Sequence, residues 1–151
     1  YMRVVRLAEL YYNFAEVAYQ AAGPDEIISV SGLNMSARGA VNAVRARVGM
    51  PEIPSGLTVA DFEKRYRNDR RVEFALEADR YFSLRRWKAL GESSVVTGMK
   101  VSGTGADLTY ERFAFDKRPT SADKYLLYPI DLTEVSKVLE LTGNDWQNPG
   151  W

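Results

Sequence analysis

Apolar residues near the start of the chain recur at steps of three and four, which predicts an amphipathic helix over residues 3–22. The residues that share one face of this helix are Val4, Leu7, Ala8, Tyr11, Phe14, Ala15, Ala18 and Ala22. Gly23 and Pro24 end the pattern, because glycine often caps a helix C-terminus and proline cannot continue a helix. We expect small alanines beside large rings to let another helix pack closely.

A second apolar stripe predicts a helix over residues 36–48, which Gly49 ends. Its members are Ala37, Ala40, Val41, Val44 and Val48. Pro51 and Pro54 then favour an extended chain. We expect the first two helices to form an antiparallel pair with the size of a tetratricopeptide-type hairpin.

A third helix is predicted to begin at Thr58, because Asp61 follows three residues later with the spacing of a capping box. From residue 63 to residue 73, eight of eleven residues are ionisable and their signs alternate. Such a pattern is typical of a solvated or ion-paired helix face. Two apolar runs follow, over residues 72–76 and 81–84, and predict a buried segment.

The helical pattern ends near Gly91, and a break near Asp79 is compatible with it. Strand-like runs over residues 94–101 and 108–115, punctuated by glycines, then predict a small irregular β-hairpin. After the short apolar, strand-like run over residues 125–130, a capping box at Asp131 predicts a last helix that ends near Leu139. The tail is turn-rich.

These elements together predict a mainly α fold with a small irregular β-hairpin and long loops. A chain of 151 residues suits one domain. We therefore expect a single domain over residues 1–151, helical over 1–91 and built of β-structure, loops and a short helix over 92–151.

Charge and composition exclude several classes of function. Twenty basic residues balance twenty acidic ones, so the chain lacks the positive charge that nucleic acids or anionic membranes attract. The sequence has no cysteine and no histidine, which removes thiolate chemistry, zinc ribbons and the commonest general base. We expect no enzymatic activity, no cofactor and no metal. No apolar stretch is long enough to span a membrane.

Arginines and carboxylates gather between residues 70 and 86. They are Arg70, Arg71, Arg80, Arg85 and Arg86 with Glu73, Glu77 and Asp79. The guanidinium groups could hold an anionic sugar, but the spacing favours an ion-pair lattice between helices. Glu73 and Glu77 lie one turn apart on one helix face, which does not suit the two carboxylates of a glycosidase.

Aromatic side chains are better candidates for a binding site, because sugars stack on flat rings. Tyr110, Trp146 and Trp151 occur in loosely structured segments, and we name them as candidate ligand-binding residues. The other aromatic residues considered are expected to be packing residues, namely Trp87, Tyr125 and Tyr128.

Several segments, in this order and spacing, carry a family resemblance. They read RLAELYYNFAE over 6–16, AVNAVRARVGMP over 40–51, DRRVEFALEADRYFSLRRW over 69–87, YLLYPI over 125–130 and QNPGW over 147–151. Together they resemble the C-terminal region of the SusD/RagB family of outer-membrane nutrient-binding lipoproteins. Ala78 stands where the family usually has glycine, which suggests that the chain stays helical there. Ser83 replaces the usual aspartate.

The resemblance implies a tetratricopeptide-like helical scaffold in a surface-exposed, lipid-anchored protein of the outer membrane, with the anchor outside this chain. It implies non-catalytic capture of an oligosaccharide or polysaccharide and its delivery to a SusC-like TonB-dependent transporter. No ligand-contacting residue of the family carries over to this region. The alternative is a tetratricopeptide-like module that binds a protein or a peptide.

A glycan binder should expose tryptophan or tyrosine beside polar loops, whereas a peptide binder should have a continuous concave helical groove. If the chain is part of a longer protein, its helices should also leave an apolar patch larger than the few hundred Å² of a typical monomer.

Overall fold

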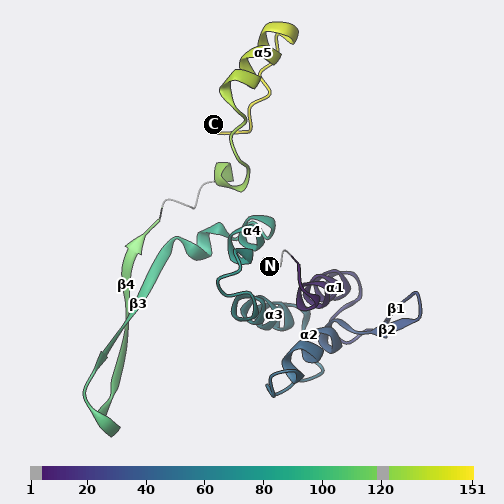
Figure 1. Cartoon of the computed structure of the whole chain (residues 1–151), viewed down its shortest axis with the longest axis vertical. Coiled ribbons are helices and arrows are strands. Elements are labelled where there is room, and N and C mark those ends of the chain that lie inside the picture. Colours follow the sequence, from purple (N-terminus) through teal and green to yellow (C-terminus); the bar gives the residue numbers. More distant parts are fainter. Residues whose placement is uncertain (1–4, 119–122) are drawn as a thin grey trace. The chain divides into compact units, whose positions relative to one another are not determined.

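A computed structural model describes residues 5–118 and 123–151 of the chain (Figure 1). The described residues contain five α-helices and two small antiparallel two-stranded sheets, which confirms the mainly α fold with a small hairpin. The chain divides into two compact units, an N-terminal unit that ends at Ala75 and a C-terminal unit that begins at Leu76. The expectation of a single domain stays a prediction.

The N-terminal unit contains three helices and a short hairpin. The helices are α1 (Leu7–Ala22), α2 (Ala37–Ala46) and α3 (Val59–Glu73), and the strands are β1 (Ile28–Val30) and β2 (Leu33–Met35). α2 and α3 each begin directly after a residue whose side chain caps the helix. The hydroxyl oxygens of Ser36 and Thr58 accept hydrogen bonds from the backbone N–H groups of Gly39 and Asp61, which would otherwise lack a partner.

Close approach of α1 and α2 depends on small residues. Ala15 and Ala18 on α1, and Ala37 and Ala40 on α2, are all buried. Without bulky side chains between them, the two helices form the most extensive helix–helix contact in this unit. The small alanines therefore lie where α1 and α2 pack against each other.

Aromatic rings fill the space between α1 and α3. Tyr12 and Tyr19 lie on one face of α1 and meet Phe62, Tyr66 and Phe74, with ring centroids 5.4 to 5.7 Å apart. The buried face of α1 therefore contains Tyr12 and Tyr19, which the predicted stripe lacked, together with Ala15 and Ala18, which it included.

A polar cluster is buried within this core. Nη1 of Arg70 donates to the Tyr66 hydroxyl at 3.0 Å and to Oδ1 of Asn13 at 2.9 Å. The Tyr66 hydroxyl lies 2.8 Å from the Glu16 carboxylate, to which it donates. Arg70 has only 4% of its surface exposed, so its positive charge depends on these partners. Nη1 of Arg70 also lies 3.9 Å from the Glu16 carboxylate, so the ion-pair interpretation of the arginine segment is correct for this residue.

The first helix begins later than predicted. Residues 3 and 4 lie outside the described residues, and Arg6 is extended, with φ −127° and ψ 159°. Its guanidinium donates to both the carboxylate and the backbone carbonyl of Glu73. This long-range contact accompanies an extended backbone at Arg6, where periodicity alone predicts helix. The second helix also ends two residues early, at Ala46, because residues 47–49 form a turn.

The hairpin of β1 and β2 was not predicted from the sequence. Its turn is Ser31–Gly32, with φ of 51° and 85°, the left-handed conformation that suits two-residue hairpin turns. Strands of three residues are too short to produce a detectable alternation.

The chain is not helical at Ala78, contrary to the expectation from the glycine-to-alanine difference. α3 ends at Glu73, and α4 (Asp79–Arg86) begins only after a turn. Ala78 has φ 62° and Leu76 has φ 67°, both left-handed. The backbone therefore keeps the conformation that a glycine favours, although an alanine occupies the position.

The two apolar runs around this turn are only partly buried. Phe74 and Leu84 are buried, whereas Val72, Leu76 and Phe82 are exposed. The prediction of a buried segment was wrong for most of these side chains, because each helix packs only one face within its own unit.

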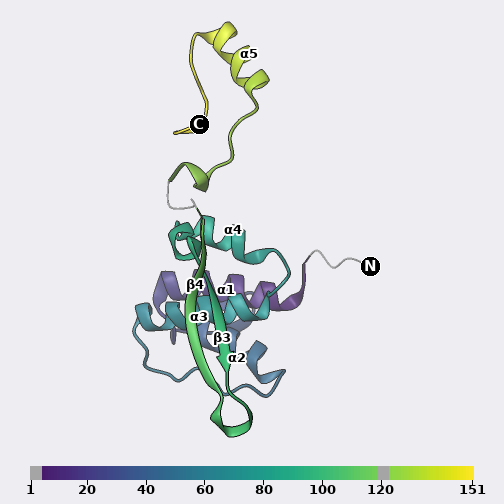
Figure 2. The ribbon, with the colours of Figure 1, turned by 90° about the vertical axis from the view of Figure 1, so that its left-hand side faces the viewer.

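The C-terminal unit contains α4, the predicted hairpin and the last helix. Strands β3 (Val95–Ser102) and β4 (Thr109–Lys117) run side by side in both views (Figures 1 and 2), with Val101 opposite Tyr110. Their register shifts between Val96 and Thr97, which marks a β-bulge. The Phe113 ring lies over Gly98, where a Cβ atom would be 2.7 Å from it.

The last helix, α5 (Leu132–Thr142), begins where the capping box predicts. The Asp131 carboxylate accepts a hydrogen bond from the Thr133 N–H at 2.8 Å. The helix continues three residues beyond the predicted end, to a left-handed Gly143 at φ 72°. The strand-like run over 125–130 is not a strand, because residues 123–126 form a short 3₁₀ helix.

Candidate binding site in the C-terminal unit

The tail of the chain is fastened to residues 124–130 by side-chain hydrogen bonds. The amide of Gln147 makes two bonds to the backbone of Ile130, accepting from its N–H at 2.8 Å and donating to its carbonyl at 2.9 Å. Asn148 donates to the Tyr128 carbonyl at 2.6 Å. The segments YLLYPI and QNPGW therefore depend on each other structurally, because side chains of QNPGW form hydrogen bonds with the backbone of YLLYPI.

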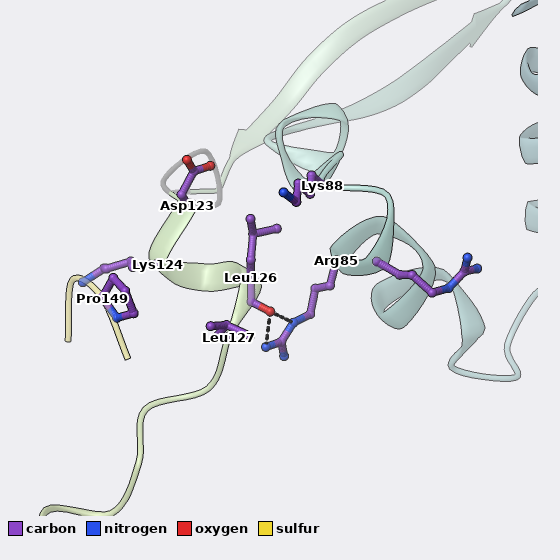
Figure 3. Close-up of a pocket in the computed structure, with 8 residues that line it drawn as sticks. Arg85, Lys88, Asp123, Lys124, Leu126, Leu127 and Pro149 are labelled. Atoms are coloured by element: carbon purple, nitrogen blue, oxygen red, sulfur yellow. Dashed lines mark hydrogen bonds between the residues drawn. The ribbon is translucent and has the colours of Figure 1, made fainter. Parts of the chain in front are cut away.

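Arg85 of α4 also contacts the segment over residues 124–130. Nε and Nη2 of Arg85 donate to the Leu126 carbonyl at 2.8 and 2.6 Å (Figure 3). The same guanidinium lies 3.9 Å from the centroid of the Tyr128 ring, a cation–π distance. Its Nη1 donates to the Tyr81 hydroxyl at 3.2 Å. Arg85 therefore supports the site structurally.

A pocket of about 500 Å³ opens beside these contacts (Figure 3). Its basic residues are Arg85, Arg86, Lys88 and Lys124, its one acidic residue is Asp123, and its apolar residues are Leu126, Leu127 and Pro149. The volume falls in the range of about 300–1,000 Å³ that is common for small-molecule sites. Basic groups over an apolar wall favour a ligand with negative charge.

Lys124 is held in place by the end of the chain. Its ammonium lies 4.7 Å from the ring centroid of Trp151 and 5.2 Å from that of Tyr125. Nε1 of Trp151 donates to the Lys124 carbonyl at 2.9 Å. Gly150, at φ 86°, lies so close that a Cβ atom there would be 2.9 Å from Cβ of Lys124.

The structure brings only one of the three candidate ligand-binding aromatics to this pocket. Trp151 lies beside it through Lys124 and is 45% exposed. Trp146 is 51% exposed and immediately precedes Gln147. Tyr110 is 66% exposed on β4, opposite Val101, and is not part of the pocket lining.

The expected packing aromatics differ in burial. Trp87 and Tyr125 are half-buried, whereas Tyr128 is exposed, with the Arg85 guanidinium against its ring. A hydrogen bond with Tyr81, with a smaller effect of desolvation, raises the pKa of the Tyr128 hydroxyl. Tyr128 therefore belongs to the support of the site rather than to a core.

Sequence reasoning missed Lys88 and Lys124. Lys88 follows the segment that ends in LRRW and has a left-handed backbone, with φ 54°. Lys124 directly precedes YLLYPI. The sequence indicates these two lysines only by their positions beside the segments that resemble the family. A single lysine in such a position is usually solvated.

The structure places the candidate carboxylate pair in different surroundings. Glu73 receives hydrogen bonds from Arg6 and Arg47, and Glu77 belongs to the C-terminal unit. Within residues 5–118 and 123–151, no cluster of three or more metal-ligating side chains occurs. No helix in the described part of the chain has the length and apolarity needed to cross a membrane.

The N-terminal unit has a smaller, apolar groove of about 280 Å³. Its lining comes from α1 and β2 and consists of Leu7, Leu10, Tyr11, Phe14, Leu33 and Met35. Leu7, Tyr11 and Phe14 of the predicted stripe of α1 thus line a groove, whereas Ala15 and Ala18 of the same stripe are in the core. Neither α2 nor α3 contributes to this lining.

Fold and site together describe a mainly helical protein with exposed aromatic rings beside a basic pocket, a class suited to binding. The sequence model of the SusD family matches the chain over residues 1–151, and the chain therefore belongs to the SusD family. No curated protein and no solved structure matches it. The family is one of binding proteins associated with the outer membrane, and membership indicates glycan or nutrient binding in outer-membrane uptake.

Proposed function

We propose that this chain is the C-terminal part of a non-catalytic glycan-binding lipoprotein that delivers oligosaccharides to a SusC-like TonB-dependent transporter. The observation that carries the proposal is the family match over the whole chain. SusD proteins generally act with such transporters at the outer membrane.

The exposed rings of the C-terminal unit support a role in sugar capture. Trp151 presents 45% of its surface and is held in one orientation by its hydrogen bond to the Lys124 carbonyl. A ring that is already oriented loses little conformational entropy when a sugar stacks on it. Trp146 and Tyr110 are further exposed rings that could contribute separate contacts.

Affinity gel electrophoresis against a panel of neutral and anionic soluble polysaccharides tests the proposal. We expect at least one polysaccharide to retard the chain, and Trp151→Ala, Trp146→Ala or Tyr110→Ala to weaken that retardation roughly two- to tenfold, the value of one aromatic contact. Trp151→Phe keeps a flat ring without the indole N–H. Val101→Ala is the matched control, because Val101 lies opposite Tyr110 on the neighbouring strand and is exposed but has no ring.

If no polysaccharide retards the chain, its proposed role in glycan binding is overturned. Peptide binding would then be favoured, and the apolar groove of α1 and β2 would be the place to examine. That groove has contributions from one helix and one strand, so it lacks the continuous concave surface of several helices that tetratricopeptide-type peptide binders present.

A further inference from the structure

The pocket beside Lys124 has an excess of positive charge that the chain as a whole lacks. Four basic side chains and one carboxylate line it, whereas the whole sequence has a formal net charge of zero. Because the chain as a whole is neutral, it has no long-range attraction to a charged surface. The positive charge gathered at this pocket therefore favours binding of an anion at this one place.

The basic residues of the pocket do not all have the same role. Arg85 donates two hydrogen bonds to the Leu126 carbonyl, and its guanidinium lies against the Tyr128 ring. Lys88 and Lys124 each end in an ammonium group that has three hydrogen-bond donors. These two lysines are therefore the groups suited to donate to a ligand.

Lys124 is also the residue that joins charge to an aromatic surface. Its ammonium lies within cation–π distance of both Trp151 and Tyr125, and the Tyr125 and Trp151 rings meet edge to face at 5.8 Å. Close packing of Gly150 against its stem restricts the side chain. A negative group bound to this ammonium would lie next to an exposed indole ring.

The pocket walls strengthen such a contact. Leu126, Leu127 and Pro149 present apolar surface beside the ammonium groups. Charge-assisted hydrogen bonds are stronger where apolar groups displace water and lower the local dielectric constant. A saccharide with anionic groups on successive rings would offer one group to Lys88 and another to Lys124 beside the indole ring of Trp151.

We propose that this pocket binds an anionic saccharide, with Lys88 and Lys124 donating to separate carboxylate or sulfate groups, because they lie on opposite sides of Leu126 (Figure 3), and with Trp151 contacting a sugar ring. The proposal rests on the proposed function, because it names the class of glycan that this chain selects. It assigns charge selectivity to the two lysines and ring contact to the tryptophan.

The test compares polygalacturonate with its methyl ester, in which the same sugar backbone has lost its negative charge. Binding of each to the full chain is measured by isothermal titration calorimetry at low salt. We expect polygalacturonate to bind about tenfold more tightly or better, because one charge-assisted hydrogen bond has about that value. Added salt should reduce this preference.

Variants assign the preference to the pocket. The double variant Lys88→Gln with Lys124→Gln should lower affinity for polygalacturonate about tenfold, to that of the ester. Lys100→Gln on β3 removes a lysine outside the pocket lining and should have no effect. Trp151→Phe should alter the binding of both polymers to the same degree. Circular dichroism and thermal unfolding confirm that each variant is folded.

Equal affinity for the two polymers, or no effect of the double variant, would overturn the proposal. Retardation by neutral polysaccharides would leave the proposed function standing in that case, so the two failures are distinguishable. Dextran sulfate against dextran separates sulfate from carboxylate recognition. Vesicles that contain phosphatidylglycerol supply anions without sugar, and equal lysine-dependent binding to them would also overturn the assignment to a saccharide.

Discussion

Ala78 is a residue whose side chain does not suit its backbone. Its φ of 62° is left-handed, a conformation in which the Cβ atom of an L-residue crowds the following carbonyl. The family resemblance places glycine at this position. The structure shows why, since the turn between α3 and α4 passes through the conformation that glycine adopts without strain.

We expect Ala78→Gly to raise the free energy of unfolding by about 1 kcal/mol, because it removes the left-handed penalty at a smaller entropic cost. Urea denaturation followed by circular dichroism measures the change. Ala75→Gly is the matched control, since Ala75 is not left-handed, and it should be neutral or destabilising. Equal effects of the two substitutions would show that strain at Ala78 is negligible.

The residues of the candidate site differ in how far sequence alone could identify them. Exposure of Trp151, Trp146 and Tyr110 follows from their turn-rich or strand-like surroundings. The importance of Lys124 does not, because it depends on Gly150 and Trp151, more than 20 residues later in the chain. A local pattern contains no information about such a long-range contact.

At the scale of elements, burial of tyrosines between α1 and α3 has a consequence for pH. Desolvation is the main cause that raises the pKa of Tyr12, Tyr19 and Tyr66 above the ordinary value of 10.0. The folded state therefore favours the neutral phenols. Their contribution to stability is complete below pH 10.0 and is lost as the pH rises above it.

We expect alkaline pH to unfold the N-terminal unit and to ionise these buried tyrosines in the same transition. Near-ultraviolet phenolate absorbance, followed together with circular dichroism, should show exposed tyrosines ionising first and the remainder only as helix is lost. Tyr110→Phe should remove signal from the first phase alone, because Tyr110 is exposed. Ionisation of every tyrosine in one phase at constant helix content would contradict the expectation.

Helix positions were predicted well where caps mark them. Thr58 and Asp131 accept the expected hydrogen bonds, and α3 and α5 begin directly after them. The sequence predicted less well which face of each helix is buried. On α1, the row through Tyr11 is apolar, whereas the row through Tyr12 contains Glu16, so the sequence favours burial of Tyr11; packing against α3 buries Tyr12 instead. The approximate fold was therefore predictable, whereas the aromatic core and the pocket were not.

At the scale of the whole molecule, large apolar side chains are exposed in both units. On α1 they include Leu7 and Val17, and on α5 they include Leu132 and Leu141, the latter 84% exposed. Scattered apolar residues are normal on protein surfaces, but helices with one side of this kind usually pack against something. The predicted large apolar patch remains a prediction.

We expect the isolated chain to bind a hydrophobic dye and to associate with itself as its concentration rises. Dye fluorescence and light scattering coupled to size exclusion measure the two effects. Leu132→Gln with Leu141→Gln should reduce both without loss of helix, because neither side chain is buried. A monomer at every concentration, with no dye enhancement, would show that these residues form no continuous patch.

Two side chains of α2 form hydrogen bonds with the backbone of the loop that follows this helix. Asn42 makes two hydrogen bonds to the backbone of Ile53, as a neighbouring strand would, with its Oδ1 2.8 Å from the Ile53 N–H nitrogen. Nε of Arg45 donates to the Pro51 carbonyl at 2.7 Å.

These contacts fix the number of residues between helix and loop, because one insertion or deletion would bring the wrong peptide groups opposite Asn42 and Arg45. We therefore expect an insertion or a deletion in this loop to destabilise the N-terminal unit. An engineer who needs to place a label in the N-terminal unit should therefore choose the exposed Ser31–Gly32 turn instead.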